Sequence, residues 1–410
     1  MSLNRIDTVF IVGAGFSSYA GLPLTSGFTE AILEARRFDS GPSRMMVDFL
    51  TTFIRDAFDH SPAAGARHWP DLEDIFTCID LSANTGHHLG GTFAPSDLRT
   101  VRRALLARII RMLDQKYKAA RKKKDPNWRK LDEFFLRVES AHVGFVSMNW
   151  DTVIERKLDA TQSGRFLPDY CCDALPAKVA NTPDSEDFSS RRDYLKALRK
   201  SYGISIEPPP VNQKNLDRVI PIIKIHGSAN WLYCDNCRAL FYFSPDKATR
   251  IADQLLSEDD LARMRLFLQK KKNIEEPPAY SSSQPPLKCV CSTDVVLATR
   301  IATFSYRKAL DFPMFQKSWF AAEDLLRFAK RWVFIGYSLP PADYEFKYLL
   351  KRIQLSRQST PEFVVVTGGS QRDVSRTYDN YQKFFGRSIK RKSTFFSTGM
   401  SQDALATIFE

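Results

Sequence analysis

The sequence lacks any long uninterrupted run of apolar residues. No stretch approaches the roughly 18 consecutive apolar residues that a membrane-spanning helix needs. The N-terminal segment MSLNRIDTVF has no extended apolar region before its first predicted strand, so we expect no signal peptide and a cytoplasmic protein. Only seven cysteines occur among 410 residues, an odd and unevenly spaced set that favours free thiols or metal ligands over disulfide bonds.

Acidic side chains are fewer than basic ones, 47 against 59, which gives a formal net charge of +12. Such an excess is compatible with nucleic acid, an anionic cofactor or an acidic protein partner. No zinc-finger spacing and no aromatic RNA-binding signature accompanies the charge, so direct nucleic-acid binding remains one alternative among these. The basic clusters 121–124 and 270–272 end helix-like segments, where lysine is commonly solvated.

Short apolar runs alternate with amphipathic segments along the chain. This alternation predicts an α/β fold with a Rossmann-like, mostly parallel sheet and helices on both faces. No internal repeat is visible in the sequence. The runs that we expect to form buried strands of this sheet are 9–12, 142–147, 219–225, 295–298, 332–335 and 362–366, with a further strand near 394–396.

Helical periodicity dominates the segment between the first two strands, including a long stripe over 98–122. A simple βαβ unit needs only about 30 residues, so we interpret 31–140 as a helical insertion. We assign 231–292, with a helix near 251–272, to a small cysteine module. The Rossmann-like core would then comprise 1–30, 141–230 with a helix near 189–201, and 293–410.

A glycine-rich turn follows the first strand. It contains Gly13, Ala14, Gly15, Phe16 and Ser17, with Gly21 shortly afterwards. A strand that turns sharply on glycine directs backbone N–H groups above the sheet, and the N-terminus of a following helix favours an anion there. The spacing is not GxGxxG, so it does not indicate a dehydrogenase, and an ordinary tight turn is the alternative.

Polar residues also follow three later strands: Asn149 and Asp151, then His226, then Gly336, Tyr337 and Ser338. Ligands of open α/β sheets bind outside the carboxyl ends of the strands, and histidine is the commonest general base. We therefore expect Asn149, Asp151 and His226 to be catalytic. The alternatives are a helix cap for Asp151 and a structural role for His226.

Four cysteines form two close pairs, Cys234 with Cys237 and Cys289 with Cys291. Four thiolates in two pairs suit one structural zinc ion, because zinc takes four ligands in such sites. The second pair is CxC and lies far along the chain, so reduced structural thiols are the alternative.

The ordered strand ends GAGFSSYAGLP, SMNWD, IHGS, IGYSL and VTGG, with a cysteine module between the third and fourth, resemble the sirtuin family. The resemblance is to its bacterial branch of NAD-consuming domains in antiphage defence systems. It implies that Gly13, Ala14, Gly15 and Ser17 hold the phosphates of NAD, and that Asn149 and Asp151 lie beside the nicotinamide-ribose. It also implies that His226 is catalytic and that Gly336 and Ser338 contact the adenosine side.

Two segments depart from the sirtuin deacylase pattern. Leu22-Pro23-Leu24-Thr25 replaces the Asp-Phe-Arg segment that helps to close over nicotinamide. The segment 295–300 replaces the Phe-Gly-Glu segment that pairs with the acyl-lysine peptide. Both departures favour water as the acceptor.

The resemblance therefore implies an NAD+ hydrolase that releases ADP-ribose and nicotinamide as the effector of an antiphage, abortive-infection system. It implies a homo-oligomer, or a partner such as a HerA-class ATPase or a short Argonaute. Two other functions remain open, an NAD-dependent protein deacylase and a non-catalytic subunit that binds NAD or ADP-ribose.

Overall fold

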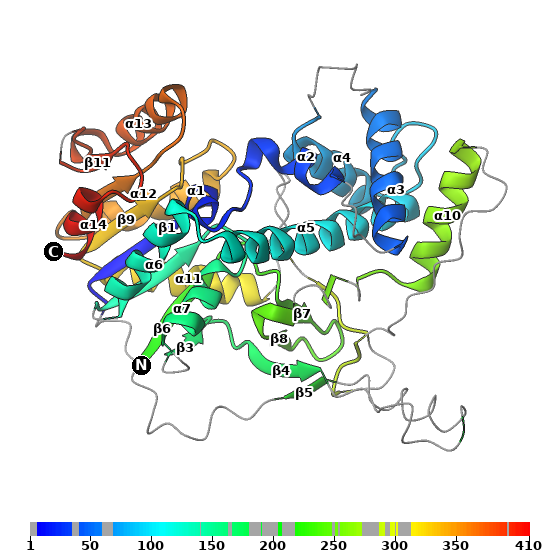
Figure 1. The fold of residues 1–410 in the computed structure, drawn as a ribbon, viewed down its shortest axis with the longest axis horizontal. Coiled ribbons are helices and arrows are strands. Elements are labelled where there is room, and N and C mark those ends of the chain that lie inside the picture. The colour runs from blue at the N-terminus through cyan, green and yellow to red at the C-terminus, as the bar shows by residue number, and fades with distance from the viewer. Residues whose placement is uncertain are drawn as a thin grey trace.

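A computed structural model of the chain (Figure 1) describes residues 6–34, 41–59, 69–139, 141–162, 166–179, 190, 204–206, 218–247, 251–252, 255–272, 287–291, 296–299, 301, 313–391 and 393–410. In this part of the chain, a large parallel sheet carries helices on both faces and adjoins a helical lobe and a small second sheet. The predicted Rossmann-like α/β fold is confirmed. The domain boundaries stay predictions.

The large sheet contains seven strands in the order β11-β10-β9-β1-β2-β6-β3, and every neighbouring pair is parallel. Its central strands are short apolar runs, as expected for parallel strands that are buried on both faces. The strands are β1 (Thr8–Val12), β2 (Val143–Ser147), β3 (Phe166–Asp169), β6 (Arg218–Lys224), β9 (Arg331–Ile335), β10 (Glu362–Val366) and β11 (Phe395–Phe396).

The chain builds this sheet outward from β1 in two directions. On one side it forms β2, then β3 at the edge and β6 between these two, and later it forms β9, β10 and β11 on the other side. The direction therefore reverses between β1 and β9. In open α/β sheets, ligands bind outside the carboxyl ends of the strands at such a reversal.

Alternate residues of β1 face two separate apolar cores. Phe10 packs on Phe134 and Phe145, with ring centroids 5.0 and 5.3 Å apart, whereas Val9 and Ile11 belong to the core on the opposite face. The first face carries α6 (Pro126–Val138), α7 (Val153–Gln162) and α14 (Gln402–Phe409), and the second carries α11 (Pro313–Phe328), α12 (Tyr344–Ser356) and α13 (Gln371–Phe385).

The helical lobe is drawn on the right of Figure 1. Its longest helix, α5, runs from the lobe to the sheet and packs against α4, α3 and α2. Helix α10 also packs on α3 and α5. It forms most of the helix predicted over 251–272, and residues 251–252 are helical as well. The helices are α2 (Phe28–Leu33), α3 (Gly41–Phe58), α4 (Leu72–Thr85), α5 (Pro95–Lys123) and α10 (Glu258–Lys272).

The small sheet has the strand order β5-β4-β8-β7. The predicted strand over 295–298 is wrong for the large sheet, because Val296 and Ala298 instead form single bridges to Lys288 and Tyr233. The predicted helix over 189–201 lies outside the described residues except for Ser190. The strands are β4 (Leu175–Val179), β5 (Ile204–Ile206), β7 (Trp231–Tyr233) and β8 (Leu240–Tyr242).

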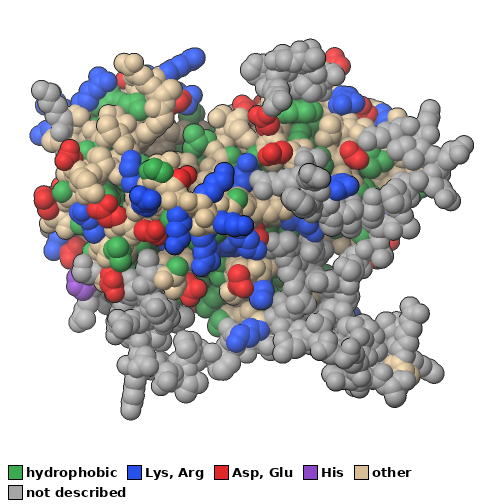
Figure 2. Space-filling view, viewed as in Figure 1, with side chains coloured by type: hydrophobic (Ala, Val, Ile, Leu, Met, Phe, Trp, Pro, Cys, Tyr) green, Lys and Arg blue, Asp and Glu red, His purple; other side chains and the backbone are tan. Residues whose placement is uncertain are grey.

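Basic side chains gather over the region where the C-terminal end of α5 meets α6 (Figure 2). Arg121, Lys122, Lys123 and Lys124 are exposed there. A helix C-terminus favours cations, so this exposure agrees with a solvated helix end, and nucleic-acid binding stays a prediction. No helix in the described ranges is long and apolar enough to cross a membrane.

Candidate functional site

A cleft lies at the carboxyl ends of β1, β2, β6 and β9, where the order of strands reverses. It contains about 920 Å³ of space that protein atoms do not fill, part of it open to solvent. Nine of the predicted site residues line it: Gly13, Ala14, Ser17, Asn149, Asp151, His226, Gly336, Tyr337 and Ser338.

Two glycine turns form the centre of the cleft floor. The Gly15 N–H donates to the Gly336 carbonyl over 2.9 Å, so the turn after β1 rests directly on the turn after β9. A Cβ atom at Gly336 would lie 2.1 Å from the Phe16 nitrogen, and the φ of Gly336 is +61°. Only glycine satisfies both conditions at this position.

The turn after β1 continues into α1 (Ala14–Ser17) and the 3₁₀ turn η2 (Ser18–Ala20). The Gly13 and Gly15 N–H groups donate to carbonyls of the neighbouring β9 and its turn. In the described chain no acceptor takes the Ala14 N–H, and Ala14 lines the cleft. The Ala14 N–H can therefore donate a hydrogen bond to a phosphate bound in the cleft.

Ser17, Asn149 and Asp151 form one hydrogen-bonded group. The Ser17 hydroxyl donates to Asp151 Oδ2 over 2.6 Å, and Asn149 Nδ2 donates to Ser17 Oγ over 2.8 Å. Asn149 Nδ2 also donates to the Gly13 carbonyl over 2.8 Å. Both amide protons of Asn149 are thus committed to the protein, and its Oδ1 stays available to accept a hydrogen bond from a ligand.

Asp151 has a structural contact as well as a place in the cleft. Its Oδ1 accepts the Val153 N–H over 3.0 Å at the start of α7. Asp151 thus contacts the start of α7 from one residue before the N-cap, which is Thr152, and its Oδ2 faces Ser17 at the same time. The carboxylate is buried and held at both oxygens, so its orientation is fixed before any ligand arrives.

The imidazole of His226 is oriented by the backbone of the β2 turn. Its Nδ1 lies 3.2 Å from the Met148 carbonyl, which can only accept a hydrogen bond. Nδ1 must therefore carry the proton in the neutral ring, and the lone pair is on Nε2. This tautomer suits a general base.

The β9 side of the cleft carries a second polar pair. The Tyr337 hydroxyl donates to Asp343 Oδ2 over 2.9 Å, and both residues line the cleft. Burial, and then the Asp343 carboxylate, raise the pKa of Tyr337 well above its usual value, so its phenol stays protonated. Asp343 had no motif to indicate it, because it follows Pro340-Pro341 in a segment that looks like a plain turn.

Three predicted residues, Gly15, Phe16 and Gly21, do not line the cleft. Phe16 is fully buried against Phe134 and Phe135. Gly21 packs so closely on α5 that a Cβ would lie 2.7 Å from Ala120 Cβ. Their assignment to ligand binding stays a prediction.

The helical lobe forms one wall of the cleft, which the sequence did not indicate. Glu73 of α4 and Leu113 of α5 face the cleft from the lobe. Leu22, Pro23 and Thr25, in the segment that departs from the deacylase pattern, line it as well. No spacing in the sequence connects these side chains to the strand ends, because their position depends on how the lobe packs.

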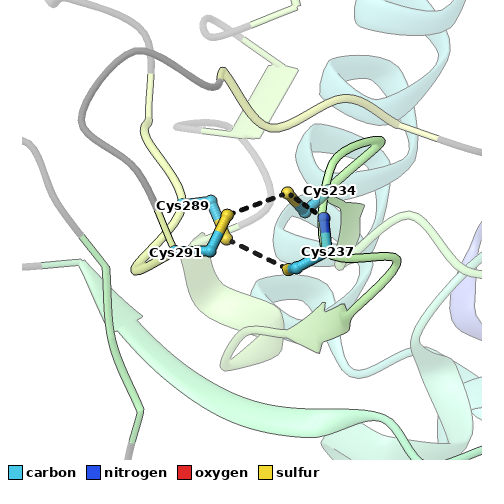
Figure 3. Close-up of side chains that lie close together, drawn as sticks. All are labelled: Cys234, Cys237, Cys289 and Cys291. Atoms are coloured by element: carbon cyan, nitrogen blue, oxygen red, sulfur yellow. Dashed lines mark hydrogen bonds between the residues drawn. The ribbon is translucent and has the colours of Figure 1, made fainter.

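The four predicted cysteines lie together (Figure 3). All four sulfur atoms are within 4.8 Å of one another, with 3.6 Å between Cys234 and Cys291 and 3.6 Å between Cys237 and Cys289. A tetrahedral zinc with Zn–S bonds of about 2.3 Å holds its sulfurs about 3.8 Å apart. The residues present therefore fit one zinc ion, and four thiolates leave no open position for catalysis.

The thiols of the cluster differ in acidity. A hydrogen bond from Asn236 Nδ2, 3.5 Å from the sulfur, lowers the pKa of Cys291 to about 7. Burial raises the pKa of Cys289. A bound cation would hold all four as thiolates.

Comparisons with known proteins add a likeness of fold. No protein-family model and no curated protein matches this chain. The chain is similar to a solved structure described as "Structural Basis for the Mechanism and Regulation of Sir2 Enzymes", with 12% sequence identity, a TM-score of 0.35, and coverage of 99% of this chain and 93% of that one. The site described above rests on the residues of this chain alone.

Proposed function

We propose that this protein is an NAD+ hydrolase that cleaves the bond between nicotinamide and ribose. The observation that carries the proposal is the meeting of Ser17, Asn149, Asp151 and His226 in one cleft at the reversal between β1 and β9. This is the position at which doubly wound sheets bind dinucleotides. The four groups can orient and polarise a ligand there.

The proposed binding mode places the diphosphate over the turn that contains Ala14. The adenosine half would lie on the β9 side, near Tyr337, Ser338 and Asp343, and the nicotinamide half near Asn149 and His226. Asn149 Oδ1 can accept a hydrogen bond from the carboxamide NH₂ of nicotinamide or from a water molecule.

The reaction breaks the C1′–N bond, and its electron pair leaves with nicotinamide, which becomes neutral. Positive charge develops on the ribose, and the buried Asp151 carboxylate is placed to stabilise it. Water then attacks C1′ and transfers a proton to His226 Nε2, which releases it to solvent. The products are nicotinamide, ADP-ribose and one proton.

The proposed test measures nicotinamide release from NAD+ by chromatography. Asn149→Ala and His226→Ala should each abolish release while the variants retain the melting temperature of the wild type within a few degrees. His88→Ala, at an exposed histidine outside the cleft, is the matched control and should keep full activity. Normal release by either site variant would contradict the assigned roles.

A protein deacylase is the competing enzyme function. Its distinguishing property is that turnover of NAD+ requires an acylated peptide, which would have to pair with an exposed strand edge. Assays with and without an acetyl-lysine peptide separate the two enzymes. Nicotinamide release that depends on the peptide would overturn the hydrolase proposal.

The biological setting follows from the resemblance described in the sequence analysis. We propose an NAD-depleting effector of an antiphage system, active as a homo-oligomer or with a HerA-class ATPase or short Argonaute. The test is NAD+ content and survival of infected cells that carry the wild type or His226→Ala. If no release occurs even with the genomic partner and a phage trigger, a non-catalytic binding subunit is the better interpretation.

A further inference from the structure

A lysine is buried directly beneath the proposed active site. Lys224 ends β6, two residues before His226, and its side chain is 1% exposed. Its ammonium donates to the backbone carbonyl of Asp151. The lysine therefore joins the end of β6 to the turn after β2 that carries Asn149 and Asp151.

The ammonium pairs with the carboxylate of Glu155, on the first turn of α7. Glu155 Oε1 lies 3.4 Å from Lys224 Nζ, and its side chain is 3% exposed. The Tyr170 hydroxyl donates to the same oxygen over 3.2 Å. Burial, and then the charge of Glu155, raise the pKa of Tyr170 well above its usual value, so the phenol remains a donor.

Asn230 extends this group to the small sheet. Its Nδ2 donates to the Tyr170 hydroxyl over 3.3 Å and to the Phe243 carbonyl over 2.8 Å. Asn230 precedes β7, and Phe243 follows β8. The buried group thus connects three parts of the fold: the small sheet, the start of α7 and the turn that carries the candidate catalytic residues.

A buried ion pair contributes little net stability to a fold. Desolvating two charges costs about as much as their attraction returns, and well-packed apolar residues often do as well. A hydrogen bond from an ammonium group does, however, fix the orientation of its acceptor, and here the acceptor is the backbone carbonyl of Asp151. The apolar side chains that fill the rest of the β6 core could not hold this carbonyl.

We propose that Lys224 and Glu155 are positioning residues for the reaction in the cleft. Lys224 fixes the turn that contains Asn149 and Asp151, and Glu155 balances and orients the ammonium. The proposal rests on the proposed function, because the reaction that it supports is the release of nicotinamide. Neither residue lines the cleft.

The test compares two double variants that each remove an ion pair whose carboxylate is buried, without leaving an unbalanced charge. The site variant is Lys224→Met/Glu155→Gln. The control, Arg103→Met/Asp260→Asn, removes the pair in the helical lobe, where Arg103 Nε lies 2.9 Å from Asp260 Oδ2. Both can lower the melting temperature, so this quantity does not distinguish positioning from general stability.

Two other measurements distinguish them. We expect the site variant to lose about tenfold or more in kcat with KM within about threefold of the wild type, because small displacements of reacting groups are costly. We also expect faster hydrogen–deuterium exchange in the peptide 147–153. The control variant should match the wild type in both. Tyr170→Phe, which keeps both charges, should show smaller changes in the same direction, and Lys224→Arg should recover part of kcat.

The outcomes separate this inference from the proposed function. If the folded site variant matches the wild type in kcat and in exchange over 147–153, the positioning role is overturned. If the wild type releases no nicotinamide, the proposed function fails, and the exchange measurement still decides whether Lys224 and Glu155 order the turn. Should the double variant not fold, Tyr170→Phe decides by the same two measurements.

Discussion

The Ser17 hydroxyl donates to Asp151 Oδ2 over 2.6 Å and joins two turns that are 134 residues apart in the sequence. It also accepts a hydrogen bond from Asn149 Nδ2 over 2.8 Å. Ser17 is 3% exposed although it lines the cleft. A single buried hydroxyl therefore aligns the carboxylate and the amide that we place beside the nicotinamide-ribose.

Ser17→Ala should reduce both activity and stability. The substitution leaves Asp151 Oδ2 without this donor and one amide proton of Asn149 without its acceptor, which costs about 1–3 kcal/mol of unfolding free energy. We expect nicotinamide release to fall by about tenfold or more. Urea unfolding and initial rates measure the two effects. Ser18→Ala is the control, because its hydroxyl donates to the carbonyl of the nearby Gly15, over 2.7 Å, and not to Asp151. Equal rates for the two variants would contradict this assignment.

Gly336→Ala should prevent the two glycine turns from packing. The new Cβ would lie 2.1 Å from the Phe16 nitrogen and 2.2 Å from the Gly15 carbonyl carbon, and backbone atoms cannot move aside cheaply. We expect a loss of more than about 4 kcal/mol in the free energy of unfolding, measured by chemical denaturation. Gly27→Ala should change it by less than about 1 kcal/mol, because Gly27 has no atom within 4 Å of the added Cβ.

The cysteine cluster should bind about one zinc ion per chain. Elemental analysis of protein purified without chelator measures this directly. Cys237→Ser should abolish zinc binding and lower the melting temperature, since the metal ties Cys234 and Cys237 of the β7–β8 hairpin to the segment 287–291. Cys78→Ser, at a cysteine outside the cluster, should retain the metal. A wild type with no metal would show that these are structural thiols.

Acid should weaken the helical lobe through Asp260. Burial alone would raise the pKa of this carboxyl, but hydrogen bonds from Arg103, Ser257 and Thr100 outweigh burial and lower the pKa below its usual value of 3.8. A lowered folded-state pKa means that the stabilisation is complete above the unfolded value and is lost as pH falls through the folded one. Melting temperatures measured from pH 6 to about pH 3 should fall less steeply for Asp260→Asn than for the wild type. Parallel curves would contradict this role.

The sequence alone predicted six of the seven strands of the large sheet and the residues at their ends, but it missed the edge strand β3 and wrongly added 295–298. The apolar runs of β1, β2, β6, β9 and β10 are short and uninterrupted, which is typical of buried parallel strands. Since parallel strands end at the same edge, Asn149, Asp151 and His226 could be expected to meet. The structure places all three in one cleft.

Residues that depend on tertiary packing could not be predicted in this way. Glu73 and Leu113 reach the cleft only because α4 and α5 pack beside it, and periodicity indicates the apolar face of a helix but not its partner. Lys224 stands in an apolar strand where a charged residue looks like a strand end. The positioning role that we propose for Lys224 depends on its ion pair with Glu155, which lies 69 residues earlier and which no local sequence pattern connects to it.

Helix α5 is one continuous element of 29 residues that belongs to both halves of the molecule. In the lobe it carries Thr100 and Arg103, which bind Asp260, then Leu113 at the cleft wall, and finally Ala120 against Gly21 beside the glycine turn. Because one continuous helix carries these contacts, a displacement of its lobe end also moves its end beside the glycine turn. Displacement of the lobe would therefore move Leu113 at the cleft wall and Ala120 beside the glycine turn together.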